Sequence, residues 1–142
     1  MCTPNILYVE DDSDTRELVS IVLGMENYQV MLAGNYDEAL MLARVMPFDL
    51  YMMDNWMPGG SGVALCRKLR EIDPATPILF YSGAAYDNDI REAMAAGAQA
   101  YVTKPADIDT LIETIERLIT APARAVIAEP QTSPMKHKMI AA

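Results

Sequence analysis

The sequence has few cysteines and no long apolar run. Two cysteines in 142 residues make no disulfide framework, so we expect a reducing, cytoplasmic location. No apolar run approaches the roughly 18 residues that cross a bilayer, which predicts no membrane insertion. The opening "MCTPNILYVEDD" lacks a basic start and turns acidic after a short apolar stretch, so we expect no secretory signal.

Positive charge is also scarce. Eleven lysines and arginines stand against twenty acidic residues, which gives a net charge of −9. This balance argues against binding nucleic acid through a broad basic face. It suits a protein that binds a cation or a basic partner, although many acidic proteins bind neither. The apolar share of 51% and the length are typical of one globular domain.

Short apolar runs alternate with helical patterns along the chain. We predict strands at residues 5–9, 28–32, 48–53, 77–81 and 100–103, and helices at 14–25, from 35 onward, 61–72, 87–96 and 107–119. Five such βα units predict an α/β fold in which helices cover both faces of a parallel sheet. The natural arrangement is a flavodoxin-like (βα)5 three-layer sandwich with strand order 2-1-3-4-5.

Apolar residues at helical spacing indicate the individual helices. In the first helix Leu18, Ile21, Val22 and Met25 recur at helical intervals, which indicates the helix at 14–25. The helix at 87–96 is rich in alanine and has only a weak apolar stripe. Little apolar burial would therefore hold it in place.

The regular pattern ends near Thr120. We predict a single domain at residues 1–120 and a C-terminal tail at 121–142 that is flexible and carries no output domain. The chain's one histidine, His137, lies in this tail. No helical relay module surrounds it, and we interpret it as an incidental surface residue.

Polar residues stand at the carboxyl ends of four predicted strands, which are neighbours in this strand order. They are Glu10, Asp11 and Asp12 after the first strand, Asp54 after the third, Ser82 after the fourth and Lys104, before Pro105, after the fifth. Each alone has an ordinary explanation, such as an acidic helix start, a turn serine or a surface lysine. Their joint placement predicts one site.

The acids of this site indicate a bound cation. Carboxylates packed closely repel one another, and a divalent cation removes that conflict. Oxygen ligands without nearby histidine or cysteine favour Mg²⁺. We predict Asp11 and Asp54 as direct ligands, Glu10 as a ligand through water, and the backbone carbonyl of Trp56 as a further oxygen.

Asp54 is the candidate nucleophile. A carboxylate held beside Mg²⁺ on a rigid strand end can attack phosphorus and form an aspartyl-phosphate. The Met-Pro-Gly-Gly stretch that follows would leave space above it for a phosphoryl donor. Lys104 would neutralise one phosphoryl oxygen. The Ser82 hydroxyl and the backbone N–H groups near Gly83 and Ala84 would bind others.

Four blocks carry a family resemblance. "ILYVEDDSDTREL", "DLYMMDNWMPGGSG", "PILFYSG" and "GAQAYVTKP" occur in this order between Asn5 and Thr120. Together they resemble the response-regulator receiver domain of two-component signalling, in its stand-alone, chemotaxis-regulator-like form. The resemblance implies a phosphohistidine donor, on a sensor histidine kinase or a histidine phosphotransfer protein, and a downstream protein target. It implies no enzyme activity beyond the domain's own phosphorylation and dephosphorylation.

The resemblance also implies roles for single residues. Glu10 and Asp11 match the acidic metal-binding pair, and Asp54 matches the phosphoacceptor. Ser82 matches a hydroxyl that moves toward the phosphoryl group, and Tyr101 matches an aromatic that changes rotamer with it. Lys104 matches the family's lysine. The two departures are Gly83, where alanine is common, and Ala106, where an aromatic is frequent.

Other interpretations stay open at this point. The chain could be a receiver that is never phosphorylated and serves as a scaffold. It could also be a phosphatase with an aspartyl nucleophile, but haloacid-dehalogenase-type enzymes place a second acid where Trp56 stands. A nucleotide-binding module is a third option, although "GGSG" lacks the ending of a P-loop. The Trp56 ring either shields a phosphoryl group from water or merely covers surface.

Overall fold

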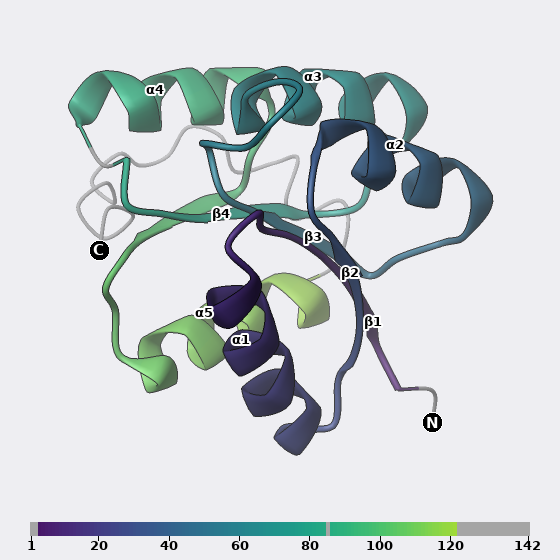
Figure 1. The fold of residues 1–142 in the computed structure, drawn as a ribbon, viewed down its shortest axis with the longest axis vertical. Helices are drawn as coiled ribbons and strands as arrows, with labels where there is room; N and C mark the ends of the chain where they lie inside the picture. Colours follow the sequence, from purple (N-terminus) through teal and green to yellow (C-terminus); the bar gives the residue numbers. More distant parts are fainter. Residues whose placement is uncertain (1–2, 85, 122–142) are drawn as a thin grey trace.

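The computed structural model describes residues 3–84 and 86–121. Strands and helices alternate strictly (Figure 1). The elements are β1 (Asn5–Val9), α1 (Ser13–Met25), β2 (Gln29–Ala33), α2 (Tyr36–Val45), β3 (Leu50–Met53), α3 (Gly62–Ile72), β4 (Ile78–Ser82), α4 (Asp87–Ala96), β5 (Ala100–Thr103) and α5 (Ile108–Thr120). All ten predicted elements are present, with ends that differ by at most two residues.

The five strands form one parallel sheet in the order β2-β1-β3-β4-β5, which confirms the predicted fold class. Neighbouring strands are in close register at the centre of the sheet. Tyr8 stands opposite Met52, Met52 opposite Leu79, and Phe80 opposite Tyr101. As a result, the carboxyl ends of β1, β3, β4 and β5 lie along one edge.

Helices cover both faces of the sheet, with α1 and α5 on one side and α2, α3 and α4 on the other (Figure 1). Alternate side chains of each strand enter two separate cores. Leu7 and Met53 belong to the core under α2, α3 and α4, whereas Tyr8 and Met52 belong to the core under α1 and α5. All four are fully buried, as two-sided burial in a parallel sheet requires.

Most of the apolar residues that indicate α1 in the sequence do not form its buried face, although Val22 is half-buried. Leu18, Ile21 and Met25 are 62%, 55% and 76% exposed, whereas Val19 and Leu23 are buried. Apolar residues occupy both faces of this helix, so periodicity alone admits two phases. Contact with the sheet selects the face with Val19 and Leu23.

Three helices begin at a side chain that caps their first turn. Asp12, Asn35 and Ser61 accept hydrogen bonds from the backbone N–H groups three residues on, which starts α1, α2 and α3. Because α1 and α3 follow the two central strands, these caps also set the loops at the carboxyl edge. No helix of the described residues has the length and apolarity to span a bilayer.

Arg70 ties the far ends of α3, α4 and β4 together. Its guanidinium donates to the carbonyl of Gly97 through Nε and Nη2, at 3.1 and 2.9 Å. It also donates through Nη1 to the carbonyls of Asp73 and Thr76, at 3.1 and 2.6 Å. One side chain thus satisfies three backbone acceptors at the junction of three elements.

We expect Arg70→Met to lower the free energy of unfolding by about 2 kcal/mol, because the carbonyls of Asp73 and Thr76 lose the Arg70 donor in a half-buried setting. Urea denaturation monitored by circular dichroism measures the change. Arg67→Met is the matched control, since Arg67 is exposed on the same helix and should cost less than about 0.5 kcal/mol. Equal losses in the two variants would contradict the role given to Arg70.

Candidate functional site

The site residues lie directly after the strands, where the sheet's hydrogen bonding continues past each strand end. The backbone N–H of Glu10 donates to Ala33 at 3.0 Å, and that of Asp54 donates to Val9 at 3.1 Å. The backbone N–H of Lys104 donates to the carbonyl of Ser82 at 2.9 Å. The backbone at these positions is therefore as rigid as the sheet.

Three carboxylates meet at this edge. Glu10, Asp11 and Asp54 each offer an oxygen, and these atoms all lie within 4.8 Å of one another. Glu10 and Asp54 are 2% and 7% exposed, whereas Asp11 is open to solvent. Oxygen donors at this spacing fit a hard divalent cation, and Asp11 leaves a solvated side by which a hydrated ion can enter.

Lys104 lies between two of these acids. Its Nζ is 2.7 Å from Glu10 Oε1 and 3.1 Å from Asp54 Oδ2. It also lies 5.3 Å from the centre of the Tyr81 ring. Burial lowers the pKa of Lys104, but the hydrogen bonds and charges of Glu10 and Asp54 outweigh it, so the pKa is raised. The ammonium is thus charged at neutral pH, and its stabilising contribution is lost only as the pH rises past this raised pKa.

Ser82 connects the central acid to the loop before α4. Its hydroxyl donates to Asp54 Oδ1 at 2.7 Å and accepts from the backbone N–H of Ala84 at 3.1 Å. Ser82 is fully buried. One carboxylate oxygen of Asp54 therefore accepts a hydrogen bond from the Ser82 hydroxyl, and the other accepts one from Lys104.

Tyr101, on β5, contacts this loop. Its ring is 1% exposed and stacks on Phe80, with centroids 5.4 Å apart and planes 3° apart. Its hydroxyl donates to the carbonyl of Ala84. A single bond thus links β5 to the segment that follows Ser82.

Several predicted residues take positions that limit their roles. Asp12 is not part of the acidic cluster, and its side chain caps α1 by accepting from the Thr15 backbone N–H at 2.9 Å. The ring of Trp56 is 71% exposed, and its backbone N–H donates to Asp54 Oδ1 at 3.2 Å. Gly83 is exposed, and a Cβ built there meets nothing within 4 Å. Of the predicted tail, residues 122–142 with His137 lie outside the described residues.

Three residues beside the site were missed from the sequence. The Tyr8 hydroxyl donates to Glu10 Oε1 at 3.2 Å, and burial together with Glu10 raises its pKa. Arg16 donates to the Glu10 carbonyl at 2.7 Å. Asn55 Oδ1 accepts from the backbone N–H of Val63 at 3.2 Å, which fixes the loop after Asp54. The period of a strand, which places residues two apart on one face, could have indicated Tyr8.

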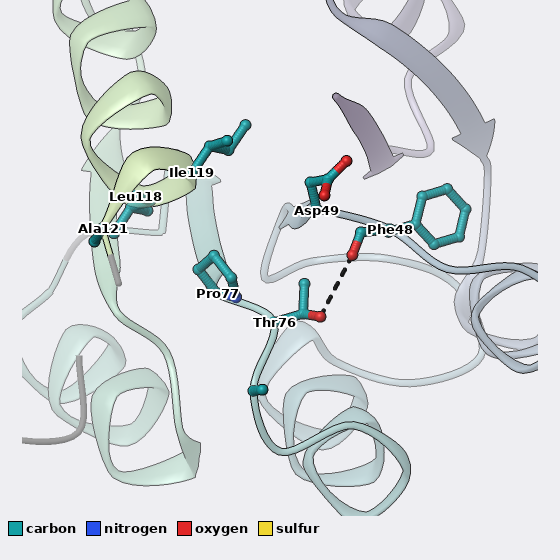
Figure 2. Close-up of a pocket in the computed structure, with 8 residues that line it drawn as sticks. Phe48, Asp49, Thr76, Pro77, Leu118, Ile119 and Ala121 are labelled. Carbon is teal, nitrogen blue, oxygen red and sulfur yellow. Dashed lines mark hydrogen bonds between the residues drawn. The ribbon is translucent and has the colours of Figure 1, made fainter. Parts of the chain in front are cut away.

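One pocket of about 220 Å³ opens at the opposite edge of the sheet (Figure 2). It lies where β3 and β4 begin and α5 ends, and Thr76 bonds to the Phe48 carbonyl there. Its lining includes Phe48, Asp49, Thr76, Pro77, Leu118 and Ile119. It contains none of the predicted site residues.

Comparisons with known proteins agree with this geometry. The family model of the response regulator receiver domain matches residues 6–116. The response regulator protein PilR of Pseudomonas aeruginosa is 31% identical over 140 residues, which is 99% of this chain but 31% of that protein's length. The chain therefore spans about a third of this relative.

Solved structures show the same fold. A CheY-like receiver domain protein from Methanospirillum hungatei superposes with a TM-score of 0.80 at 27% identity, covering 83% of this chain and 94% of that one. The response regulator TrrA from Thermotoga maritima, solved in complex with Mg²⁺ and a beryllium fluoride, gives 0.75 at 30% identity, with 82% and 99% covered.

Proposed function

The chain belongs to the response regulator receiver domain family, and on that premise we propose that Asp54 accepts a phosphoryl group and that the modified site switches a protein-binding face. We also propose roles for the residues around it, with Glu10, Asp11 and Asp54 as the cation site and Ser82 and Lys104 as phosphoryl contacts. The observation that carries the proposal is the pair of bonds on Asp54, which has Ser82 on one oxygen and Lys104 on the other.

The transfer itself needs one bond formed and one broken. An Asp54 oxygen attacks phosphorus, the bond from phosphorus to the donor's imidazole nitrogen breaks, and its electron pair stays on the imidazole. Lys104 can then contact a phosphoryl oxygen, because it already lies 3.1 Å from Asp54 Oδ2. Ser82 and the backbone N–H of Ala84 supply further donors on the other side.

Mg²⁺ would be held by Asp11, Asp54 and the backbone carbonyl of Trp56, with Glu10 acting through water. When bound, it supplies the positive charge that offsets both the acids and the incoming phosphoryl oxygens. The support for this assignment is the oxygen-only donor set, with its three carboxylates within 4.8 Å.

The conformational change that follows phosphorylation would pass through Ser82 and the loop before α4. If the Ser82 hydroxyl turns to a phosphoryl oxygen, it releases the Ala84 backbone N–H, whose residue also holds the Tyr101 hydroxyl. A change at Asp54 would thereby reach the loop before α4 and Tyr101 on β5, and we propose that the face formed by α4, β5 and α5 changes shape. We propose a sensor histidine kinase or a histidine phosphotransfer protein as donor and a protein target for the switched face.

The rival functions have less support. A phosphatase of the aspartyl type would need a second acid near the nucleophile, and position 56 holds an exposed tryptophan instead. A receiver used only as a scaffold would not need Lys104 and Ser82 on the two oxygens of Asp54. Shielding of the phosphoryl group by the Trp56 ring stays a prediction, which the rate of phosphoryl loss from Trp56→Ala can test.

We expect removal of Mg²⁺ to stop phosphorylation. Incubation with a small acyl-phosphate donor should label the wild-type protein in Mg²⁺, and excess chelator should reduce the rate at least about a hundredfold because the acids would then repel the donor. Phosphate-affinity gels measure the labelled fraction. Equal labelling with and without chelator would contradict the proposed cation site.

A further inference from the structure

We propose that Tyr8 is a positioning residue for the cation site: its buried hydroxyl holds the carboxylate of Glu10 in the orientation that binding Mg²⁺ requires. The inference rests on the proposed function and extends it to a residue outside the acids themselves. Tyr8 lies on β1, on the face covered by α1 and α5, two residues before Glu10.

The contacts fix Glu10 from two sides. Its Oε1 accepts from the Tyr8 hydroxyl at 3.2 Å and lies 2.7 Å from Lys104 Nζ. Its Oε2 accepts from the backbone N–H of Asp12 at 3.2 Å. Oε1 thus has two donors, the Tyr8 hydroxyl and Lys104, and Oε2 has one, the backbone N–H of Asp12.

The Tyr8 hydroxyl is a rigid donor. The residue is fully buried, and its neighbours across the sheet are Leu32 and Met52. A tyrosine hydroxyl in such a core costs free energy unless it is hydrogen-bonded, and Glu10 is its partner within the described part of the chain. Because the ring is packed in the core, the hydroxyl is held at the Glu10 carboxylate.

The Tyr8 hydroxyl matters because residue 10 is a glutamate, whose side chain is longer and more flexible than that of an aspartate. A glutamate carboxylate has one more rotatable bond than an aspartate and loses more rotamer freedom when a ligand fixes it. The Tyr8 hydroxyl removes part of that freedom before the cation arrives. An aspartate would end one carbon–carbon bond, about 1.5 Å, earlier and would leave the 3.2 Å contact out of reach.

The bond from Tyr8 to Glu10 also has a role in the metal-free protein, because Lys104 binds the same glutamate oxygen. Without the Tyr8 hydroxyl, Lys104 alone would set the position of Oε1. With two donors, Oε1 is fixed both from β1 and from Lys104. Partners of this kind behind metal ligands raise metal affinity by ordering them.

The test is a Mg²⁺ titration of the full chain, followed by the fluorescence of Trp56, the chain's one tryptophan, and in parallel by amide NMR shifts. We expect Tyr8→Phe to raise the Mg²⁺ Kd about tenfold, in a protein that urea denaturation in metal-free buffer shows to be folded. Tyr81→Phe is the matched control. It removes a hydroxyl from the same face but keeps the ring beside Lys104, and its Kd should stay within about twofold of wild type.

A double-mutant comparison tests whether Tyr8 acts through Glu10. In a Glu10→Asp background, Tyr8→Phe should change the Kd by less than about twofold. If both tyrosine variants weaken binding equally, if Tyr8→Phe binds like wild type, or if its effect persists in Glu10→Asp, the inference is overturned. A wild-type protein that binds no Mg²⁺ would instead overturn the proposed function.

A measurement on the unaltered protein covers the case in which Tyr8→Phe fails to fold. The hydroxyl proton of Tyr8, protected by burial, should give an NMR signal that shifts as Mg²⁺ saturates the site. A signal that stays unchanged at saturation contradicts the inference.

Discussion

Asp54→Asn should abolish labelling by a small acyl-phosphate donor, with a rate at least about a thousandfold below wild type. An amide nitrogen or oxygen cannot form the acyl-phosphate that the carboxylate forms. The fold should survive, because asparagine keeps an oxygen for the Ser82 hydroxyl and removes one of three clustered charges. We therefore expect the urea midpoint to be equal to or slightly above that of wild type. Mass spectrometry of the intact protein measures the phosphorylated fraction.

Asp12→Asn is the matched control for that loss. Asp12 is an acid of the same loop, but it caps α1 through Thr15, and asparagine caps a helix equally well. Its labelling rate should stay within about threefold of wild type. Labelling that survives in Asp54→Asn, or that fails equally in Asp12→Asn, would show that Asp54 is not the acceptor.

Gly62→Ala should lower the free energy of unfolding by about 3 kcal/mol. A Cβ on Gly62 would lie 2.6 Å from the carbonyl oxygen of Asp54, 2.8 Å from the Cα of Asn55 and 2.8 Å from the Phe80 ring. Two of these atoms are backbone and cannot turn aside. The start of α3 must therefore move away from β3, which would also displace Asp54 and slow labelling about tenfold. Urea denaturation and the labelling rate measure the two effects.

Gly24→Ala is the comparison for this glycine. A Cβ there meets nothing within 4 Å, and the residue lies within α1, where alanine is the better helix former. We expect it to raise the free energy of unfolding by about 0.5 to 1 kcal/mol. If Gly62→Ala were tolerated as well as Gly24→Ala, the close contact of α3 with the loop after Asp54 would not exist in solution.

The order of elements was predictable because the apolar runs are separated by helical patterns, and parallel strands with short connections permit few topologies. The convergence of Glu10, Asp54, Ser82 and Lys104 followed from this order alone. The phase of α1 was not predictable in the same way. One face of the helix carries Val19 and Leu23, and another carries Leu18, Ile21 and Met25. Both faces are apolar, and only contact with the sheet determines which one is buried.

The supporting bonds of the site were also beyond the sequence pattern. The strand period places Tyr8 on the same face as Glu10, but it does not show that the Tyr8 hydroxyl reaches the Glu10 carboxylate. Gly62 reads as part of a glycine-rich turn, although its need for glycine comes from the backbone of Asp54 and Asn55. Such contacts depend on distances of a few ångströms between elements, which periodicity does not specify.

The most direct test of the account is the position of the phosphoryl group itself. Borohydride reduces an aspartyl-phosphate to homoserine, and mass spectrometry of peptides from the labelled, reduced protein locates the altered residue. The account predicts homoserine at position 54, only when Mg²⁺ was present during labelling. A phosphoryl group found on Ser82 or on any other residue, with Asp54 unaltered, would contradict it.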